Sequence, residues 1–537
     1  MPGLFNLCAV VALGLAGSGC EFDADYEPQP NVRTQAAAQP VPAGAATSPA
    51  VVPGPAAPSA AMPESTHLTV QQAVVSALEN NPSFQVDRYR PPESRTAEEI
   101  QRAAFDPTLT AGLQAGQDHD RADLSGRSGD RVTDGNSAEL TAGIKQTLPT
   151  GTAWKADVGA NYDDSRGGGS TRSRSLNWDA GVTQALLKGG NTDANYASLR
   201  QAKIDTRISE FELRGAAETL VGAVEQSYWN TVLADRTITI YQKSLDVADQ
   251  QVTEVKERIA VGRLAESELA AAEAEAASSR EQLIDARGTL AKEKLGLLKL
   301  LSGPSGAPDP AAAWHRDLEL DEAPETALVA LEPADTHAQV ALQERPDLNQ
   351  ARLEVQRGEL DIVRTRNGLL PQLDLFLTLG GSRYADSFTT APDADGRNLH
   401  YTAGLNLTYP LGNRDAEARH ARARLTDAEN REALRNMEDL VQQDVRTAYV
   451  DVQTAAEKIA ATAATRALRQ KTLDVENEKF RVGKSTSFLV AQAQRDLVIS
   501  QIAELEAVVR YRQALLSLYR LEGSLLQRRG IQPAEVP

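Results

Sequence analysis

Short segments of this sequence alternate strictly between apolar and polar side chains. Residues 150–162 place Trp154, Val158 and Tyr162 on one face and polar residues such as Asp157 on the other. A period of two is typical of a β-strand with one apolar side and one polar side. The same alternation predicts six strands, at about 107–116, 138–147, 152–163, 175–185, 371–383 and 398–409.

Two other stretches, each longer than a hundred residues, contain no proline. One lies between Asn191 and Gly303, and the other lies between Leu411 and Gln532. Because proline costs about 3 kcal/mol inside a helix, its absence permits very long helices. The first stretch carries the spacing of a coiled-coil seam, formed by Leu213, Ala217, Leu220, Val224, Ser227, Thr231, Ala234, Ile238, Tyr241, Leu245, Ala248, Val252, Val255 and Ile259. The second repeats it less cleanly, with Val441, Val445, Ala448, Val452, Ala455 and Ile459.

The two proline-free stretches are copies of one another. VEQSYWNTV in the first matches VRTAYVDVQ in the second, and Gly262 matches Gly483 at an offset of 221 residues. In each copy, about 70 residues of predicted helix lead to that glycine and about 40 lead back. At about 1.5 Å per residue, the long arm spans roughly 105 Å. Since the returning arm is shorter, we expect one further helix beside each long arm, at 67–104 and at 338–368.

The first twenty residues predict an export signal. In LFNLCAVVALGLAGSGC, an apolar stretch and small residues precede Cys20, which makes Cys20 the predicted site of lipidation. An ordinary cleaved signal is the alternative, since no Lys or Arg precedes the apolar stretch and Gly17 stands where a lipoprotein signal usually has Leu.

The chain as a whole is predicted to contain two repeats joined by a connecting segment. The expected parts are a signal peptide (1–20), a disordered Pro/Ala-rich tether (21–64), a first repeat (65–303) with strands at about 107–185 and a helical hairpin at 190–303, an equatorial segment (304–337), a second repeat (338–525) with strands at about 371–409 and a helical hairpin at 411–525, and a C-terminal tail (526–537).

Composition narrows the class of protein. Aromatic residues make up only 5% of the chain and charged residues 24%, which favours long helices with thin seams over a large globular core. The net charge of −18 argues against nucleic acid as a partner, because phosphate contacts need clustered Lys and Arg. Cys8 and Cys20 are the only cysteines, so the rest of the chain forms no disulfide. No apolar run beyond the leader reaches the roughly 18 residues of a transmembrane helix.

No motif for catalysis or for a cofactor is predicted. RVGKST at 481–486 resembles part of a phosphate-binding loop, but Glu478 stands where that loop needs glycine. The six histidines are scattered without metal-ligand spacing, so we expect them on the solvated surface. The many carboxylates lie at coiled-coil spacing, where solvated charges or salt bridges between subunits are expected. The sequence therefore predicts no enzyme, no cofactor and no metal site.

The apolar faces of the predicted strands lack an obvious protein partner, because the helices use their apolar residues in their own seams. Segments of about ten residues with this alternation are typical of an outer-membrane barrel. The tight turn LPTGT and the long polar stretches at 117–137, 164–174 and 384–397 fit the two kinds of loop in such a barrel. A soluble antiparallel sandwich is the alternative. The predicted lipid-facing residues are Trp154, Val158, Tyr162, Trp178, Leu375, Leu377, Leu405 and Leu407.

Over about residues 65–525, the sequence resembles the TolC family of outer-membrane efflux proteins. The resemblance lies in the duplication, in QALLKGGN and YPLGNRDAEARHARARL after the strands, in RPDLNQARLEVQRGELDIVRTRNGLLPQLDL before them, and in the glycine-centred tips. It implies an α+β membrane protein, in which a trimeric outer-membrane β-barrel continues into a long periplasmic α-helical coiled-coil barrel with two internal repeats per chain. Family members commonly contribute four strands each. Six strands per chain would make eighteen in a trimer, unless the hairpin at 138–163 lies outside the wall.

The resemblance also implies a function. The chain would be the passive exit duct of a tripartite efflux or secretion system, located in the outer membrane with a periplasmic extension. Its partners would be two further copies, outer-membrane lipid, a periplasmic membrane-fusion adaptor protein and an inner-membrane transporter of the RND or ABC type. A periplasm-spanning scaffold or adhesin that transports nothing is the alternative.

The helical tips would then form the periplasmic entrance and the adaptor contact. The implied residues are Arg258, Val261, Gly262, Arg263, Leu264 and Glu268 in the first copy, and Arg481, Val482, Gly483, Lys484 and Ser485 in the second. Glu268 matches an acidic position at the entrance of some family members, whereas the second copy has Leu489 and Gln492 there. A separate hypothesis is that salt bridges between protomers, among tip Arg and Glu residues, close the lumen at rest.

Overall fold

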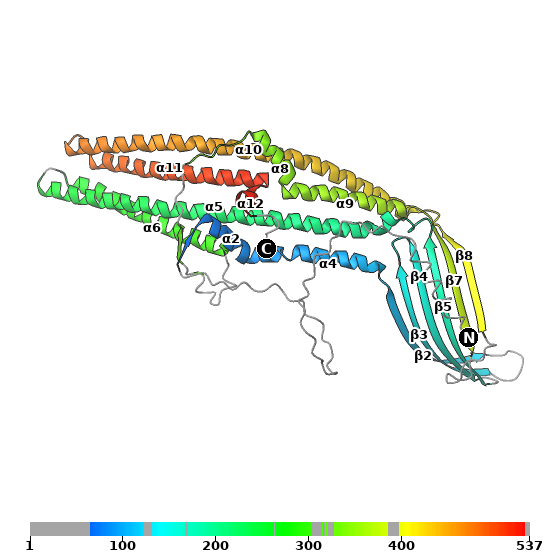
Figure 1. Cartoon of the computed structure of the whole chain (residues 1–537). Coiled ribbons are helices and arrows are strands. Elements are labelled where there is room, and N and C mark those ends of the chain that lie inside the picture. Colours follow the sequence, from blue (N-terminus) through cyan, green and yellow to red (C-terminus); the bar gives the residue numbers. More distant parts are fainter. Residues whose placement is uncertain are drawn as a thin grey trace, which may run out of the picture. The chain divides into compact units, whose positions relative to one another are not determined.

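The computed structural model describes residues 65–122, 131–166, 170–262, 264–301, 314, 317–320, 327–384 and 397–531. This part contains four long helices, α5 (Thr192–Ala260), α6 (Ser267–Leu301), α10 (Arg414–Arg481) and α11 (Ser487–Glu522). Figure 1 shows α6 beside α5 and α11 beside α10. With 69 and 68 residues, α5 and α10 each rise about 100 Å at about 1.5 Å per residue. The predicted sites Cys20 and Arg263 lie outside the described residues.

The turns that end α5 and α10 share one backbone conformation. Val261 has φ −93° and ψ 9°, and Val482 has φ −93° and ψ 8°. Gly262 and Gly483 follow, each with φ +74°, a left-handed conformation that glycine adopts without strain. The matching backbone conformations of the two tips support the duplication inferred from the sequence.

The shorter helices are broken, contrary to the prediction of one helix per copy. Instead of one helix at 67–104 and one at 338–368, the structure has α2 (Val70–Asn80), α3 (Pro82–Asp87), α4 (Arg90–Arg102) and the 3-10 turn η1 (Ala103–Phe105), and then α8 (Ala334–Glu344) and α9 (Pro346–Gly368). Two of the breaks precede a proline. Asn81 and Arg345, with ψ 120° and 122°, have extended backbone, because the ring of Pro82 or Pro346 disfavours a helical residue before it.

One antiparallel sheet contains all six predicted strands, in the order β2-β3-β4-β5-β7-β8. The strands are β2 (Thr108–Ala122), β3 (Arg131–Thr147), β4 (Thr152–Arg166), β5 (Ser170–Ala185), β7 (Gln372–Tyr384) and β8 (Arg397–Thr408). Several are longer than predicted, since parts of the expected polar loops at 117–137 and 164–174 are strand. Backbone pairing continues there because the ladder does not depend on apolar side chains. A separate parallel pair joins β1 (Ser65–Leu68) to β6 (Asp317–Leu320).

Two hydrophobic cores lie along the helices, one centred on α2, α5 and α6 and the other on α8, α10 and α11. In the first, Tyr228 is fully buried and its hydroxyl donates a hydrogen bond to the carbonyl of Leu68 (2.9 Å). Leu525 and Leu526 of α12 (Leu525–Arg528) pack into this same core. The second core contains four residues of the predicted second seam, Val441, Val445, Ala448 and Val452. These contacts confirm that part of the seam is buried.

The expectation that helical carboxylates and histidines are solvated is wrong at six of the described positions. The buried residues are Glu218, Glu225, Glu275, Asp427, Glu522 and His337. Each carboxylate pairs with an arginine of the same chain, namely Arg214, Arg529, Arg495, Arg431 and Arg528 in that order. His337 lies against the ring of Tyr449, with Nδ1 3.4 Å from Glu522. These buried carboxylates therefore have charge partners within one chain.

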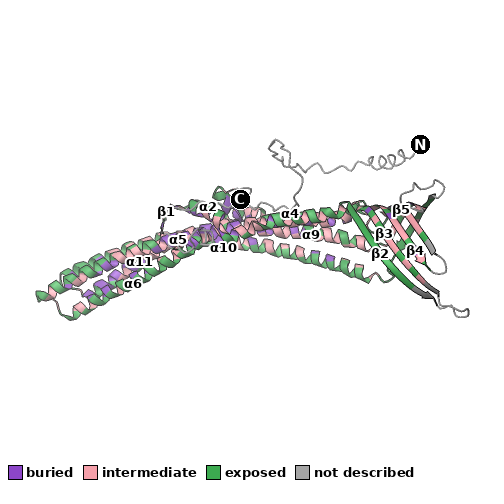
Figure 2. Cartoon of the chain, turned by 90° about the horizontal axis from the view of Figure 1, so that it is seen from below, coloured by how far each residue is buried: buried purple, intermediate pink, exposed green. Residues whose placement is uncertain are grey.

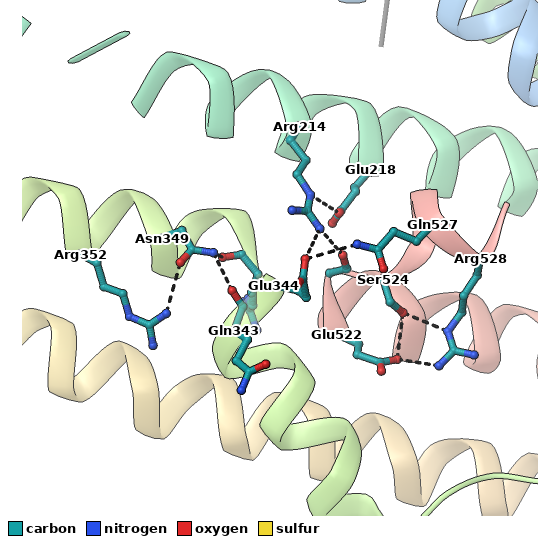
Figure 3. Close-up of polar contacts among 12 residues, drawn as sticks. Arg214, Glu218, Gln343, Glu344, Asn349, Arg352, Glu522, Ser524, Gln527 and Arg528 are labelled. Atoms are coloured by element: carbon teal, nitrogen blue, oxygen red, sulfur yellow. Dashed lines mark hydrogen bonds and ion pairs between the residues drawn. The ribbon is translucent and has the colours of Figure 1, made fainter. Parts of the chain in front are cut away.

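Arg214 of α5 joins three elements where the two repeats meet (Figure 3). Its Nε lies 3.4 Å from Glu218 on the same helix, and its Nη2 lies 3.0 Å from Glu344 at the end of α8. Nη2 also donates a hydrogen bond to the carbonyl of Gly523, which follows α11 (2.9 Å). One guanidinium therefore links the first repeat to two helix ends of the second.

Burial raises the pKa of Glu218 from 4.5 to about 7, although Arg214 opposes the shift. Asp347 and Glu344 raise this pKa further through like charge. Since the pKa in the folded state exceeds the ordinary value, the contribution of Glu218 to stability is fully present below pH 4.5 and is lost as the pH rises through 7. Glu218 is 3% exposed, so the loss is of the order of 3 kcal/mol per chain.

We expect Glu218→Gln to remove this part of the pH dependence. The free energy of unfolding of the wild type falls between pH 5 and pH 8 by about 3 kcal/mol more than that of the variant. Urea unfolding followed by circular dichroism at both pH values measures the difference. Parallel curves for the two proteins would contradict the assignment of the shift to Glu218.

Candidate functional site

The register of the sheet brings all eight predicted lipid-facing residues onto one face. Val158 is paired with Trp178, and Trp154 is paired with Val182, which in turn faces Leu377. The remaining members of the set follow by the same alternation along β4, β7 and β8, namely Tyr162, Leu375, Leu405 and Leu407. The structure therefore gathers on one surface residues that lie as much as 253 positions apart, from Trp154 to Leu407.

This apolar surface is largely open. Leu377 is 54% exposed and Leu405 is 64% exposed, while Trp154 is partly covered and its indole N–H donates a hydrogen bond to Gln146 (3.1 Å). Among the residues that the structure describes, the only other sheet is the two-stranded pair β1–β6. In that part of the chain, no second sheet covers the apolar face, contrary to a soluble sandwich. An open apolar face of this size marks a surface that meets another apolar phase or protein.

The opposite face of the sheet is polar and charged. Lys155 lies 3.6 Å from Asp157, and Asp179 lies 3.2 Å from His400. The second pair spans the strand between them, because Gly380 separates Asp179 from His400 in the register and a Cβ at Gly380 would collide with both side chains. Because charged groups are costly to remove from water, this face of the sheet must be in contact with water.

Within the described residues, neither edge of the sheet is paired with another strand. Figure 2 shows β2 in the colour of exposed residues, and every side chain from Thr108 to His119 is exposed. The other edge strand, β8, is exposed over most of its length. Long edges of this kind invite pairing with another chain unless they are closed into a barrel.

The helical tips present a second exposed surface. Val261 and Val482 are each 68% exposed, and space is open around both tip glycines. Beside them, Arg258 ties the two hairpins together, because its guanidinium lies over the ring of Phe480 (4.8 Å to the centroid) and donates a hydrogen bond to the carbonyl of Phe480 (3.4 Å). The structure thus brings the tips of the two copies together.

Glu268 provides a second contact between the two tips. Its carboxylate accepts hydrogen bonds from the backbone N–H (3.0 Å) and the hydroxyl of Ser487 at the start of α11. Within the second tip, Glu476 accepts hydrogen bonds from Lys479 (2.6 Å) and Ser485 (2.8 Å), which lower its pKa. Arg481 pairs with Glu478 of its own helix (3.1 Å). Leu264 and Lys484 lie beside these residues in the connecting turns.

Sequence reasoning missed Phe480 and Ser487 as tip residues. The hydroxyl of Thr486 caps α11 by accepting a hydrogen bond from the N–H of Leu489. A Thr-Ser pair just after a tip glycine and before an apolar run is a signal for a helix start that could have drawn attention to this position.

Residues 73–303 and 338–524 match the sequence profile of the family described as outer membrane efflux protein. These two segments make up more than half of the chain and coincide closely with the two predicted copies. The chain belongs to this family.

Known proteins of the same kind resemble the chain along most of its length. The outer membrane efflux protein BepC of Brucella suis biovar 1 (strain 1330) is 24% identical over 409 residues, which are 76% of this chain and 83% of BepC. A membrane protein from Pseudomonas aeruginosa has the same fold with a TM-score of 0.63 and 19% identity, covering 84% of this chain and 90% of that one. The CmeC outer membrane channel of Campylobacter jejuni gives a TM-score of 0.63 and 15% identity, covering 85% and 86%.

Membership of this TolC-type family makes the protein an outer-membrane efflux channel with a periplasmic extension. Within the part of the chain that the structure describes, no helix combines the length and apolarity needed to cross a membrane.

Proposed function

We propose that three copies of this chain form the passive exit duct of a tripartite efflux or secretion system. A periplasmic membrane-fusion adaptor protein and an inner-membrane transporter of the RND or ABC type would deliver the cargo. The observation that carries the proposal is a six-stranded sheet with an open apolar face, a charged face and two unpaired edges. Six strands alone cannot close a wide channel, so several chains must share the wall.

The apolar face is the lipid contact of this duct, and the charged face lines its water-filled lumen. An outer-membrane barrel needs both properties in alternation along every strand. Lipidation of Cys20 stays a prediction and would add a second anchor in the same membrane.

The helical tips form the periplasmic end of the duct. Val261 and Val482 supply apolar contact area for the adaptor, because two exposed valines at the ends of rigid helices lose little side-chain entropy on binding. The same tips form the entrance for cargo. The residues that we assign to this end are Arg258, Val261, Gly262, Arg263, Leu264, Glu268, Arg481, Val482, Gly483, Lys484 and Ser485.

Single-channel recording in planar bilayers tests the duct against the scaffold. The purified assembly, with its adaptor added, should conduct ions in discrete steps. An assembly that inserts into the bilayer but never conducts would instead support a scaffold or adhesin.

Conductance also tests the closed entrance. We expect Arg481→Ala and Arg258→Ala each to raise the mean conductance, because each removes a charge that holds the resting tip closed. An exposed ion pair contributes at most about 1 kcal/mol, so the open population should rise by up to about fivefold. Arg510→Ala is the matched control, since Arg510 has a similar exposed pair with Glu506 on α11 away from the tip. Unchanged conductance in both tip variants would contradict the closed entrance.

A further inference from the structure

The hairpin β3–β4 is joined to its neighbours along its whole length. All fifteen residues of β4 from Thr152 to Arg166 are paired with β5 or with β3. On its other side, β3 is paired with β2 from Lys145 to Arg131. If the hairpin lay outside the wall, β2 would have to pair with β5 instead, and the register shows no such pairing.

The hairpin also has the two faces of a wall element. Leu140 and Val158 are exposed on the apolar side of the sheet, at 55% and 54%. Lys145, Lys155 and Asp157 lie on the polar side, next to Asp179 of β5 in the same register. A hairpin with this composition is stable only between lipid and water, because any other placement exposes its apolar face to water or its charges to lipid.

The turn between β3 and β4 is fastened to the first turn of α5. The side-chain amide of Asn195 donates hydrogen bonds to the carbonyls of Pro149 and Gly189 (2.7 Å each). The carbonyl of Gly151 accepts a hydrogen bond from the N–H of Ala185 (3.0 Å). Gly151 has φ +77°, and a Cβ there would collide with the carbonyl of Gly189. The turn is therefore built into the junction where β5 leads into α5.

We propose that β3–β4 is part of the barrel wall, so that three chains of six strands each close a barrel of eighteen strands. This inference rests on the trimeric duct proposed above. Since barrel diameter grows roughly linearly with strand number, the lumen in the membrane is about one and a half times as wide as twelve strands would make it. The number of helices per chain is unaffected by the hairpin. Selection of cargo by width therefore takes place at the helical entrance and not in the membrane.

A variant without the β3–β4 hairpin can be made with the rest of the sheet unchanged. Deleting residues 131–166 removes β3, its turn and β4, and connects β2 to β5 through residues 123–130 and 167–169. Following the register across the sheet, Thr108 would then face Gly181 and Gly112 would face Asn177. The number of deleted strands is even, so both strand direction and the apolar and polar faces are preserved.

Labelling with maleimide-polyethylene glycols of graded size measures the width of the lumen from outside the cell. The reporter is Thr402→Cys on the polar face of β8, and Ala403→Cys on the apolar face is its matched control. We expect the full-length reporter to react with polymers about one and a half times wider than those that reach the same cysteine in the deletion variant. The control should stay unlabelled in both. An equal size limit in the two proteins would overturn the inference.

Electron cryo-microscopy of the wild-type assembly in lipid nanodiscs gives a measurement that needs no variant. Eighteen strands in the wall are expected, and twelve would overturn the inference. The two proposals fail in different ways. A conducting trimer with twelve strands contradicts only the wide barrel, whereas an assembly that is not trimeric or does not conduct contradicts the proposed duct.

Discussion

Leu377→Arg is expected to abolish assembly in the outer membrane. Leu377 lies in the apolar run of β7, a strand with neighbours on both sides, and it is 54% exposed to the surroundings of the sheet. An arginine on the lipid face near the bilayer midplane costs about 2–4 kcal/mol, and a trimer carries that cost three times. Membrane fractionation and heat-dependent gel mobility should show a loss of assembled channel of more than about a hundredfold.

The control for this variant is Thr378→Arg, one residue further along the same strand. Thr378 belongs to the polar face, where its register partner on β8 is Thr402. An added arginine meets water there, so assembly should remain close to that of the wild type. Normal assembly of Leu377→Arg, or equal loss in both variants, would refute the lipid contact. So would a mature wild-type protein that stays monodisperse in buffer without detergent.

The strands could be predicted well because their signal is local. Alternation along Leu373–Leu379 or Trp154–Tyr162 identifies a strand and its two faces without any knowledge of its neighbours. The strand ends could not be predicted in the same way. Polar residues at 117–122 and 131–137 continue the ladder, and nothing in their side chains distinguishes paired from unpaired backbone. The order of the strands likewise depends on pairing over long distances.

The helices show the same division between local and distant information. Gly262 and Gly483 identify the tips, since a left-handed residue that ends a long helix is nearly always glycine. Pro82 and Pro346 are local signals for the two breaks. Matching the summed lengths of the shorter helices to the long arms nevertheless favours one continuous helix across each proline. Buried glutamates such as Glu218 could not be recognised, because the spacing of a carboxylate on a helix does not reveal which other helix covers it.

The duplication explains which residues of the two hairpins contact one another. Arg258 and Phe480 are 222 positions apart, Glu268 and Ser487 are 219 apart, and Glu275 and Arg495 are 220 apart. The offset between the copies is 221. Nearly equivalent positions of the two hairpins therefore lie side by side. An internal repeat predicts such contacts once the two copies are taken as parallel neighbours.

The junction of the two copies is expected to depend most strongly on Arg214. Arg214→Ala removes the guanidinium that pairs with Glu218 and Glu344 and that donates to the carbonyl of Gly523. Breaking a buried ion pair from one side typically costs about 3–5 kcal/mol, because the remaining charge stays buried without compensation. Without Arg214, which lowers the pKa of Glu218, that carboxyl group binds its proton even more tightly. The loss of unfolding free energy should therefore be large at pH 8 and smaller at pH 6.

Urea unfolding of the purified protein at the two pH values measures this loss, and two further variants identify its cause. Adding Glu218→Gln to Arg214→Ala should recover much of the stability at pH 8, since it removes the uncompensated charge. Arg200→Ala is the control on the same helix, because its pair with Asp193 is exposed, and it should change stability by less than about 1 kcal/mol. If the Arg214→Ala deficit is equal at both pH values and unaffected by Glu218→Gln, the buried pair is not what holds the two copies together, and the packing of Leu525 and Leu526 in the first core must do so instead.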